Sequence, residues 1–250
     1  MNDAVKTYTA APDLLKDRVI MVTGAGAGIG RSAALSCAAH GATVILLGRT
    51  TKKLEEVYDE IETAGGARPG IAVLDLLKAQ GEAYTQLATT IDQEYGKLDG
   101  LLHNAGILGQ RSPIEHHEVK SWLQVMHVNV NSAFILTQAM LPLLKAAPEA
   151  SIVFTSSGVG RVGRAYWGAY AVSKFATEGL AQVLADEMRD STNIRVNCIN
   201  PGATRTNMRS SAYPAEDPEQ LKHPDAIMGP YLYLLGPDSK DVNGQSLDCQ

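Results

Sequence analysis

The sequence predicts a doubly wound α/β protein, built on a parallel sheet of about seven strands with helices on both faces. Short apolar runs alternate with longer helical patterns from residue 18 to about residue 200. The runs are apolar along their whole length, which is typical of parallel strands covered on both sides. A glycine-rich turn, TGAGAGIG at 23–30, joins the first run to the first helical pattern, where a dinucleotide-binding motif is expected.

Each expected strand is an apolar run bounded by glycine or polar residues, and each expected helix is a longer alanine-rich or amphipathic pattern. The expected strands cover residues 18–24, 42–48, 70–76, 98–106, 151–157, 194–200 and 244–250. The expected helices cover residues 31–41, 51–66, 78–95, 116–145, 166–190 and 227–236.

The chain is expected to form one domain. Residues 1–16 are polar and precede the first strand, so we interpret them as an N-terminal extension to a single domain over 17–250. The periodicity fails after residue 203, where prolines and polar residues dominate up to about residue 228. A long irregular segment directly after a strand is usually functional. We therefore predict a substrate lid at about 204–228.

Composition excludes several classes of protein. A formal net charge of −5 and a pI near 5.7 argue against a nucleic-acid partner. The sequence has no apolar run long enough to span a bilayer and no secretory h-region at its start, so neither a membrane association nor a signal peptide is expected. The three cysteines are scattered and the His116–His117 pair is isolated, which favours a reduced cytoplasmic protein without a metal site.

The glycine-rich turn is expected to bind a pyrophosphate. Gly24, Gly28 and Gly30 let the backbone turn sharply and approach the phosphates, while Ile29 faces them through its peptide group. The following helix supplies free N–H groups and the positive end of its dipole. A plain strand-to-helix turn is the alternative interpretation.

The end of the second expected strand favours NADP over NAD. NAD-dependent proteins of this kind carry a carboxylate there for the ribose hydroxyls. This chain has Gly48 at that place, and Arg49 follows it. A cation beside an absent carboxylate suits the 2′-phosphate of NADP, although Arg49 could equally be a surface residue without a ligand.

Tyr170 and Lys174 are four residues apart in AYAVSKFATEG, so a helix places them on one face. A nearby cation favours the phenolate form of a tyrosine, which could then exchange a proton with an alcohol at neutral pH. A solvated pair on a helix surface is the plainer alternative.

Five motifs in order resemble the short-chain dehydrogenase/reductase family, in its branch of single-domain members with about 250 residues. The resemblance runs from Arg18 to Gly244, and it implies a Rossmann-type sheet in the order 3-2-1-4-5-6-7. The string from Phe154 to Gly179 is similar to one bacterial subgroup, the YciK-type oxidoreductases. The motifs are TGAGAGIG (23–30), HNAG (103–106), VNVNSAF (128–134), YAVSK (170–174) and NPGATRT (200–206).

The resemblance implies four catalytic residues. Tyr170 would be the general acid/base, and Lys174 would lower its pKa and hold the nicotinamide ribose. Ser157 would hydrogen-bond the substrate oxygen, whereas Ser156 should face away from it in strand alternation. Asn129 would hold a water that links Lys174 to solvent.

The resemblance also implies the remaining cofactor contacts. Tyr170 and Lys174 would contact the cofactor as well as the substrate. The other implied contacts are Asp75 and Leu76 at the adenine, Asn104, Ala105 and Gly106 on the floor of the cleft, and Pro201, Gly202 and Thr206 at the nicotinamide end. Asp75 could instead be a turn residue at the end of its strand.

The expected reaction is NADP-dependent hydride transfer between a nicotinamide and a carbonyl or alcohol compound. The apolar candidates for the substrate pocket favour a nonionic compound, whereas Arg161 and Arg164 could bind an acidic group or simply face solvent. A non-catalytic dinucleotide sensor or scaffold is the alternative function, and a homodimer or homotetramer is expected. The pocket candidates are Leu108, Val159, Tyr166, Trp167, Met208 and Tyr213.

Overall fold

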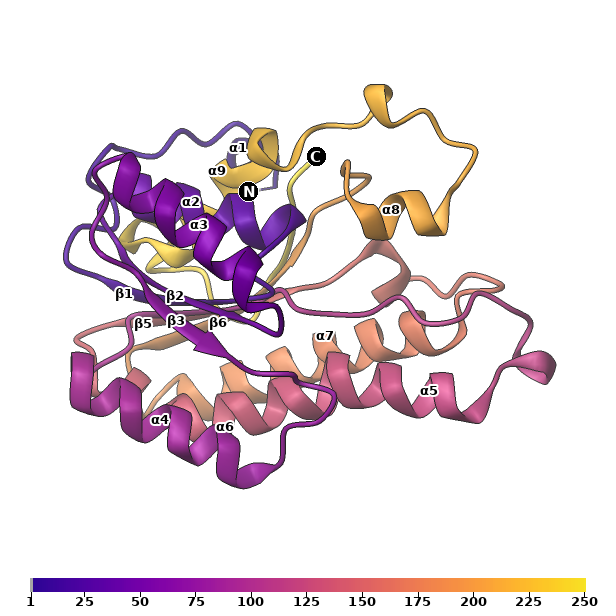
Figure 1. Ribbon diagram of the computed structural model, residues 1–250, viewed down its shortest axis with the longest axis horizontal. Coiled ribbons are helices and arrows are strands. Elements are labelled where there is room, and N and C mark those ends of the chain that lie inside the picture. Colours follow the sequence, from indigo (N-terminus) through magenta and orange to yellow (C-terminus); the bar gives the residue numbers. More distant parts are fainter. Residues whose placement is uncertain (1) are drawn as a thin grey trace.

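A single parallel sheet organises the computed structural model, which describes residues 2–250 (Figure 1). Its strand order is β3-β2-β1-β4-β5-β6-β7, and every neighbouring pair is parallel. The predicted fold class and strand order are therefore confirmed. The strands are β1 (Val19–Thr23), β2 (Thr43–Gly48), β3 (Gly70–Val73), β4 (Gly100–His103), β5 (Ala150–Thr155), β6 (Ile194–Asn200) and β7 (Ser246–Asp248).

Helices cover both faces of the sheet and bury two apolar cores. One core packs α2, α3 and α9 against one face, and the other packs α4, α6 and α7 against the opposite face. Successive residues of β1 alternate between them, with Ile20 and Val22 in the first and Val19 and Met21 in the second. The helices are α1 (Asn2–Lys6), α2 (Gly28–Ala39), α3 (Thr51–Thr63), α4 (Gly81–Tyr95), α5 (Val119–Met126), α6 (Ser132–Ala146), α7 (Gly168–Met188), α8 (Asn207–Ala212) and α9 (Met228–Leu235).

The continuous helix expected over 116–145 is interrupted. The structure has α5, then a π-helical turn at His127–Asn131, then α6. A π turn adds one residue to the hydrogen-bonded loop, and such turns occur mostly inside α-helices at functional sites. Apolar periodicity continues across the turn, so the sequence pattern gave no sign of it.

Residues 4–17 pack against the body of the protein. Val5 and Leu15 are buried in the first core. The ring of Tyr8 lies 5.1 Å from that of Tyr233 in α9, and its hydroxyl donates to Asp238 at 2.7 Å. The segment that reads as a polar extension therefore contributes apolar side chains to the domain core.

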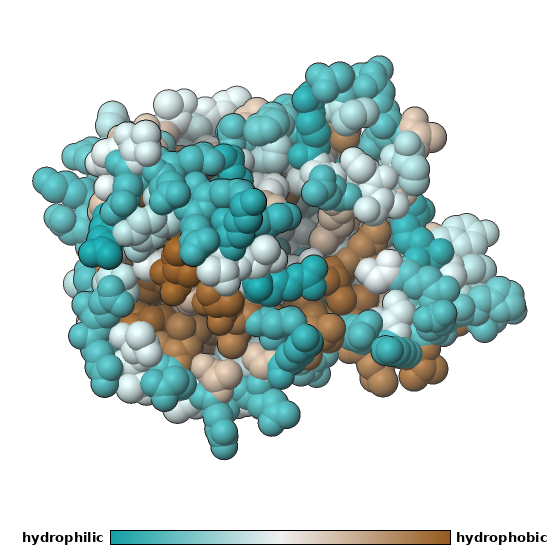
Figure 2. All heavy atoms as spheres, in the orientation of Figure 1, coloured by the Kyte–Doolittle hydropathy of each residue, from teal (hydrophilic) through white to brown (hydrophobic). Residues whose placement is uncertain are grey.

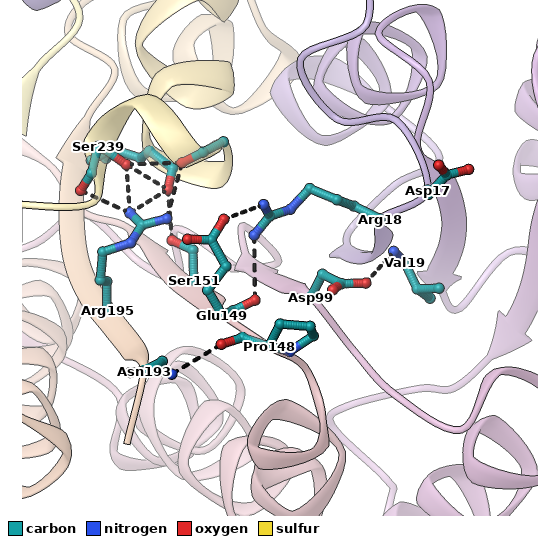
Figure 3. A network of polar contacts seen from close by, with 12 residues as sticks. Asp17, Arg18, Val19, Asp99, Pro148, Glu149, Ser151, Asn193, Arg195 and Ser239 are labelled. Carbon is teal, nitrogen blue, oxygen red and sulfur yellow. Dashed lines mark hydrogen bonds and ion pairs between the residues drawn. The ribbon is translucent and has the colours of Figure 1, made fainter. Parts of the chain in front are cut away.

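A polar network closes the edge of the sheet at which its strands begin (Figure 3). The Arg195 guanidinium is buried and donates to the carbonyl oxygens of Leu234, Gly236 and Ser239. Arg18 donates to the Glu149 carboxylate at 2.6 Å, and the Asp99 carboxylate accepts from the Val19 N–H at 2.8 Å. Apart from the Arg18 Nε, which has no partner in the described residues, these charged groups are hydrogen-bonded, so the network holds α9 and the strand starts together.

Candidate active site

A cleft of about 890 Å³ opens at the other edge of the sheet, where the strands end. Figure 2 shows the hollow between the segment that carries α8 and the body of the molecule. Loops from six strand ends line it together with residues of α2, α3 and α7, and every predicted site residue except Gly30 and Asn129 belongs to this lining. This is the edge at which doubly wound sheets bind ligands.

The glycine turn brings its backbone close to the neighbouring loops. Gly24 and Gly28 have φ angles of +70° and +55°, which side chains rarely adopt. A Cβ on Gly30 would lie 2.3 Å from the Gly24 carbonyl oxygen, so Gly30 is needed for the packing of α2 on the turn. The first turn of α2 has neither a side-chain cap nor an acidic residue. Its N–H groups are therefore available to an anion.

Asn104 joins two strand ends beneath this turn. The Thr23 hydroxyl accepts from the N–H groups of Asn104 at 2.9 Å and of Ala105 at 3.0 Å. The Asn104 side-chain amide donates back to the Thr23 carbonyl at 3.2 Å. The floor of the cleft is therefore a fixed junction between β1 and β4, with Ala105 and Gly106 at its surface.

Basic side chains line the cleft where β2 ends. Arg49 is exposed there, and Lys53 in the first turn of α3 lies beside it in the lining. Neither forms an ion pair with any residue in the described part of the chain, whereas the neighbouring Arg31 is paired with Glu60. Sequence reasoning missed Lys53, although a basic residue in the first turn after β2 was a visible signal.

Asp75 combines both interpretations that the sequence left open. Its carboxylate accepts from the Leu77 N–H at 3.1 Å, as a turn residue does, and it also lines the cleft together with Leu76.

Tyr170 and Lys174 lie one turn apart on α7 and are both buried. The Lys174 ammonium lies 5.6 Å from the centre of the Tyr170 ring and donates to the Thr155 carbonyl at 2.6 Å. Burial raises the pKa of Tyr170 to about 12 and lowers the pKa of Lys174 to about 8. Desolvation of the phenolate thus acts against the lowering of the Tyr170 pKa that the resemblance assigns to Lys174, and that role stays a prediction.

The two serines after β5 lie in different surroundings. Ser157 is half-buried, and its hydrogen bond to Tyr170 acts against the rise in the tyrosine pKa caused by burial. Ser156 is buried, and its hydroxyl has no hydrogen-bond partner within residues 2–250. Of the two hydroxyls, that of Ser157 is the one placed beside the phenol.

Asn129 lies in the π turn and lines no part of the cleft. Its amide donates to Ile107 O and to the Ser173 hydroxyl, each at 3.0 Å. Its side-chain oxygen accepts from Ile107 N–H at 2.8 Å. The side chain thus ties the loop after β4 to α7, one residue before Lys174.

Apolar and aromatic side chains form the wall beyond Tyr170. Trp167, Tyr170, Ala171 and Ala212 are packed together. Of the predicted pocket residues, Leu108, Val159, Met208 and Tyr213 pack against this group. Tyr166 does not, because its φ of +70° turns the side chain outward and leaves it 59% exposed.

Arg161 and Arg164, whose role the sequence left open, have different partners in the structure. Arg161 is bound to Asp248 at 2.7 Å and lies 3.5 Å from Glu178, so it ties the loop after β5 to the end of the chain. Arg164 instead donates to the Tyr213 hydroxyl at 2.9 Å.

The strand order, the glycine turn and the buried Tyr-Lys pair together define an oxidoreductase that uses a nicotinamide dinucleotide. The chain belongs to the short chain dehydrogenase family, which it matches over residues 18–217.

Relatives of this family resemble the chain over nearly its whole length. It is 55% identical to the uncharacterized oxidoreductase YciK of Escherichia coli, over 97% of this chain and 96% of that protein. A short-chain dehydrogenase structure from Pseudomonas syringae superimposes with a TM-score of 0.96 at 58% identity, covering 97% of this chain and 98% of that one. One from Escherichia coli in complex with NADPH has a TM-score of 0.94 at 55% identity, covering 96% and 100%.

Residues 2–250 contain neither a cluster of metal-binding side chains nor a helix that could span a membrane. No group of three or more His, Cys, Asp or Glu side chains is arranged to hold a metal ion. None of the described helices combines the length and apolar character needed to cross a membrane.

Replacing Gly30 with alanine should destabilise the protein and weaken dinucleotide binding, because the added methyl group overlaps the Gly24 carbonyl. Overpacking of this kind costs about 1–3 kcal/mol. Gly81→Ala is the matched control, since nothing lies within 4 Å of a Cβ at the start of α4. Thermal unfolding with and without dinucleotide measures both effects, and equal behaviour of the two variants would contradict the role given to Gly30.

Proposed function

We propose that this protein is an NADP-dependent oxidoreductase that interconverts a carbonyl compound and the corresponding alcohol, with Tyr170 as the general acid/base. The observation that carries this proposal is the placement of Ser157, Tyr170 and Lys174 together in the lining of a cleft that begins at the glycine turn. Bound nicotinamide supplies or accepts the hydride.

Tyr170 suits the role of proton donor in the reductive direction. With a pKa raised to about 12, its phenol keeps its proton at neutral pH. The Ser157 hydroxyl and the Tyr170 hydroxyl would both donate to the oxygen on which negative charge develops. In the oxidative direction the phenolate is needed, and the Lys174 ammonium is the cation that would stabilise it.

Lys174 is expected to stabilise the Tyr170 phenolate less as the pH rises, because it loses its positive charge. Its pKa is lowered to about 8, so the charged ammonium predominates below that pH and the neutral amine above it. Its bond to the Thr155 carbonyl uses one of three donors, which leaves two for a ribose hydroxyl and a water.

The expected water relay from Lys174 would run through the π turn rather than through the Asn129 side chain, which already makes three hydrogen bonds. In a π turn each N–H donates to the carbonyl five residues earlier instead of four. One main-chain carbonyl is therefore left without a donor from the helix and can accept a hydrogen bond from water. Asn129 would then act by holding that turn against α7.

NADP is favoured over NAD by two cations without ion pairs. Arg49 and Lys53 line the cleft at the place where the 2′-phosphate would lie, and neither has a carboxylate partner in the described residues. The glycine turn fits the pyrophosphate, since Gly24 and Gly28 adopt φ angles that side chains rarely allow and the first turn of α2 has no side-chain cap on its N–H groups. The Escherichia coli neighbour in complex with NADPH supports the same assignment.

Replacing Tyr170 with phenylalanine tests the reaction. The variant should lose NADPH-dependent carbonyl reduction by roughly 100- to 10,000-fold, because the proton donor is removed. NADPH binding, measured by nucleotide fluorescence, should persist, since only one hydroxyl is lost.

Retained turnover in Tyr170→Phe would reject the assignment of the general acid. Nucleotide binding by the parent protein without turnover of any compound in a broad carbonyl panel would instead favour the alternative function, a non-catalytic dinucleotide sensor or scaffold.

Replacing both Arg49 and Lys53 with glutamine should raise the KM for NADPH at least about tenfold, because charge-assisted hydrogen bonds contribute about 1.5–3 kcal/mol each. The KM for NADH should change little. Lys52→Gln is the control, since Lys52 is exposed outside the cleft. A parallel loss for both nucleotides would show that these cations do not select the phosphate.

A homodimer or homotetramer is part of the proposal, together with a cytoplasmic location. Large apolar side chains are exposed on α5, α6 and α7, among them Leu123, Phe134 and Phe175. The three cysteines are buried and free, which suits a reducing compartment. Light scattering on the purified protein measures the assembly, and a monomeric mass at micromolar concentration would contradict it.

A further inference from the structure

Next to the apolar wall beyond Tyr170 lies a cluster of three arginines and two aromatic rings, which we call the arginine–aromatic cluster (Arg111, Arg164, Trp167, Arg209 and Tyr213). Trp167 and Arg209 line the cleft, and Arg111 and Arg164 are exposed beside it. The Arg111 guanidinium carbon lies 4.8 Å from the centre of the Trp167 ring and 5.2 Å from that of Tyr213. Arg209 covers Tyr213 at 3.9 Å. Arg164 donates to the Tyr213 hydroxyl at 2.9 Å.

The cluster joins the loops that follow three neighbouring strands. Arg111 comes from the loop after β4, Arg164 from the loop after β5, and Tyr213 from the lid segment after β6. Arg111 also donates to the Ala212 carbonyl, at the end of α8. Because rings and hydrogen bonds hold these guanidinium groups, little side-chain freedom remains to be lost when a ligand binds them.

The charges in the cluster are unequally satisfied. Arg209 forms two hydrogen bonds of 2.5 Å with the carboxylate of Glu216. Arg111 and Arg164 donate only to neutral oxygens, and no carboxylate within residues 2–250 forms an ion pair with either. Nearby Arg161 has Asp248 and Glu178. Arg161 and Arg209 are thus neutralised by carboxylates, whereas Arg111 and Arg164 are not.

The surroundings of these two arginines lead back to the catalytic phenol. Trp167, which lies under Arg111, is 5.7 Å from Tyr170, ring centre to ring centre. Trp167, Met208 and Ala212 all line the cleft. Two ring contacts therefore connect the proton donor to Arg111, and Tyr213, whose ring lies 5.8 Å from that of Trp167, connects Arg164 to the same wall.

We propose that Arg111 and Arg164 bind the carboxylate of an oxo-acid substrate, whose carbonyl group reaches Tyr170 across the apolar wall of Trp167, Met208 and Ala212. This inference rests on the proposed function and narrows its substrate class. It replaces the nonionic compound favoured by the sequence with one that is apolar in the middle and acidic at the far end. The guanidinium fork suits a carboxylate, because it offers paired N–H donors in one plane.

Binding can be measured without turnover through Trp167. The chain has two tryptophans, so Trp122→Phe leaves Trp167, beneath Arg111, as the sole reporter. In the presence of NADP, this protein is titrated with 7-oxooctanoate and with its methyl ester, which differ in the charge at one end. The acid should bind roughly tenfold or more tightly than the ester, since a charge-assisted hydrogen bond is lost in the ester.

The same titrations in Arg111→Gln, Arg164→Gln and the double variant identify the site. The ratio of the two affinities should fall in each single variant and reach about one in the double variant. Loosening of the wall alone would weaken acid and ester alike and leave the ratio unchanged. Arg189→Gln is the control, because Arg189 is exposed past the end of α7 and paired with Asp186.

Equal affinity for acid and ester in the parent protein, absence of acid binding, or a preference that survives in the double variant would each overturn the proposal. Failure of the proposed reaction gives a different result. A protein that prefers the acid in the titration but does not oxidise NADPH in its presence would support the anion site and reject the carbonyl reductase.

Discussion

The site depends on an ammonium group held away from water. Lys174 is buried beneath the end of β5 and is anchored by the main-chain oxygen of Thr155. A main-chain oxygen partly offsets the lost hydration but carries no formal charge, and the Glu178 carboxylate one turn further along α7 also favours the charged ammonium. The position of this charge follows from the sheet, because β5 places the carbonyl and α7 places the lysine. The turn that holds Asn129 then fixes α7 through Ser173.

The two edges of the sheet have opposite characters. Where the strands begin, Arg195, Arg18 and Asp99 have their partners within the protein (Figure 3). Where the strands end, Arg49 and Lys53 lack carboxylate partners in the described chain, and glycines replace side chains. One edge therefore contributes to stability, and the other keeps unsatisfied groups for ligands. This division agrees with the general behaviour of doubly wound sheets.

The parts of the fold and site that could be predicted are those encoded locally. The glycine turn and the Tyr170–Lys174 pair lie within single short strings, and each apolar run marks one strand. The partner of Lys174 could not be predicted, because it is a backbone oxygen nineteen residues away. The rise in the pKa of Tyr170 could not be predicted for a similar reason, since burial depends on elements that pack around α7 from elsewhere. The break before α6 was missed because one extra residue inside a long helical pattern leaves no characteristic residue type in the sequence.

The packing of the first residues against α9 has a consequence for the order of folding. Val5 and Leu15 share a core with Tyr231, Leu235 and Leu247, so that core brings together the two ends of the chain. During synthesis the early strands emerge long before the partners that complete this layer. Contacts between such distant segments are slow to form, because a large loop must close first. The α2 face of the sheet is therefore expected to be completed late in folding, after the segment that carries α9 and β7 has been made.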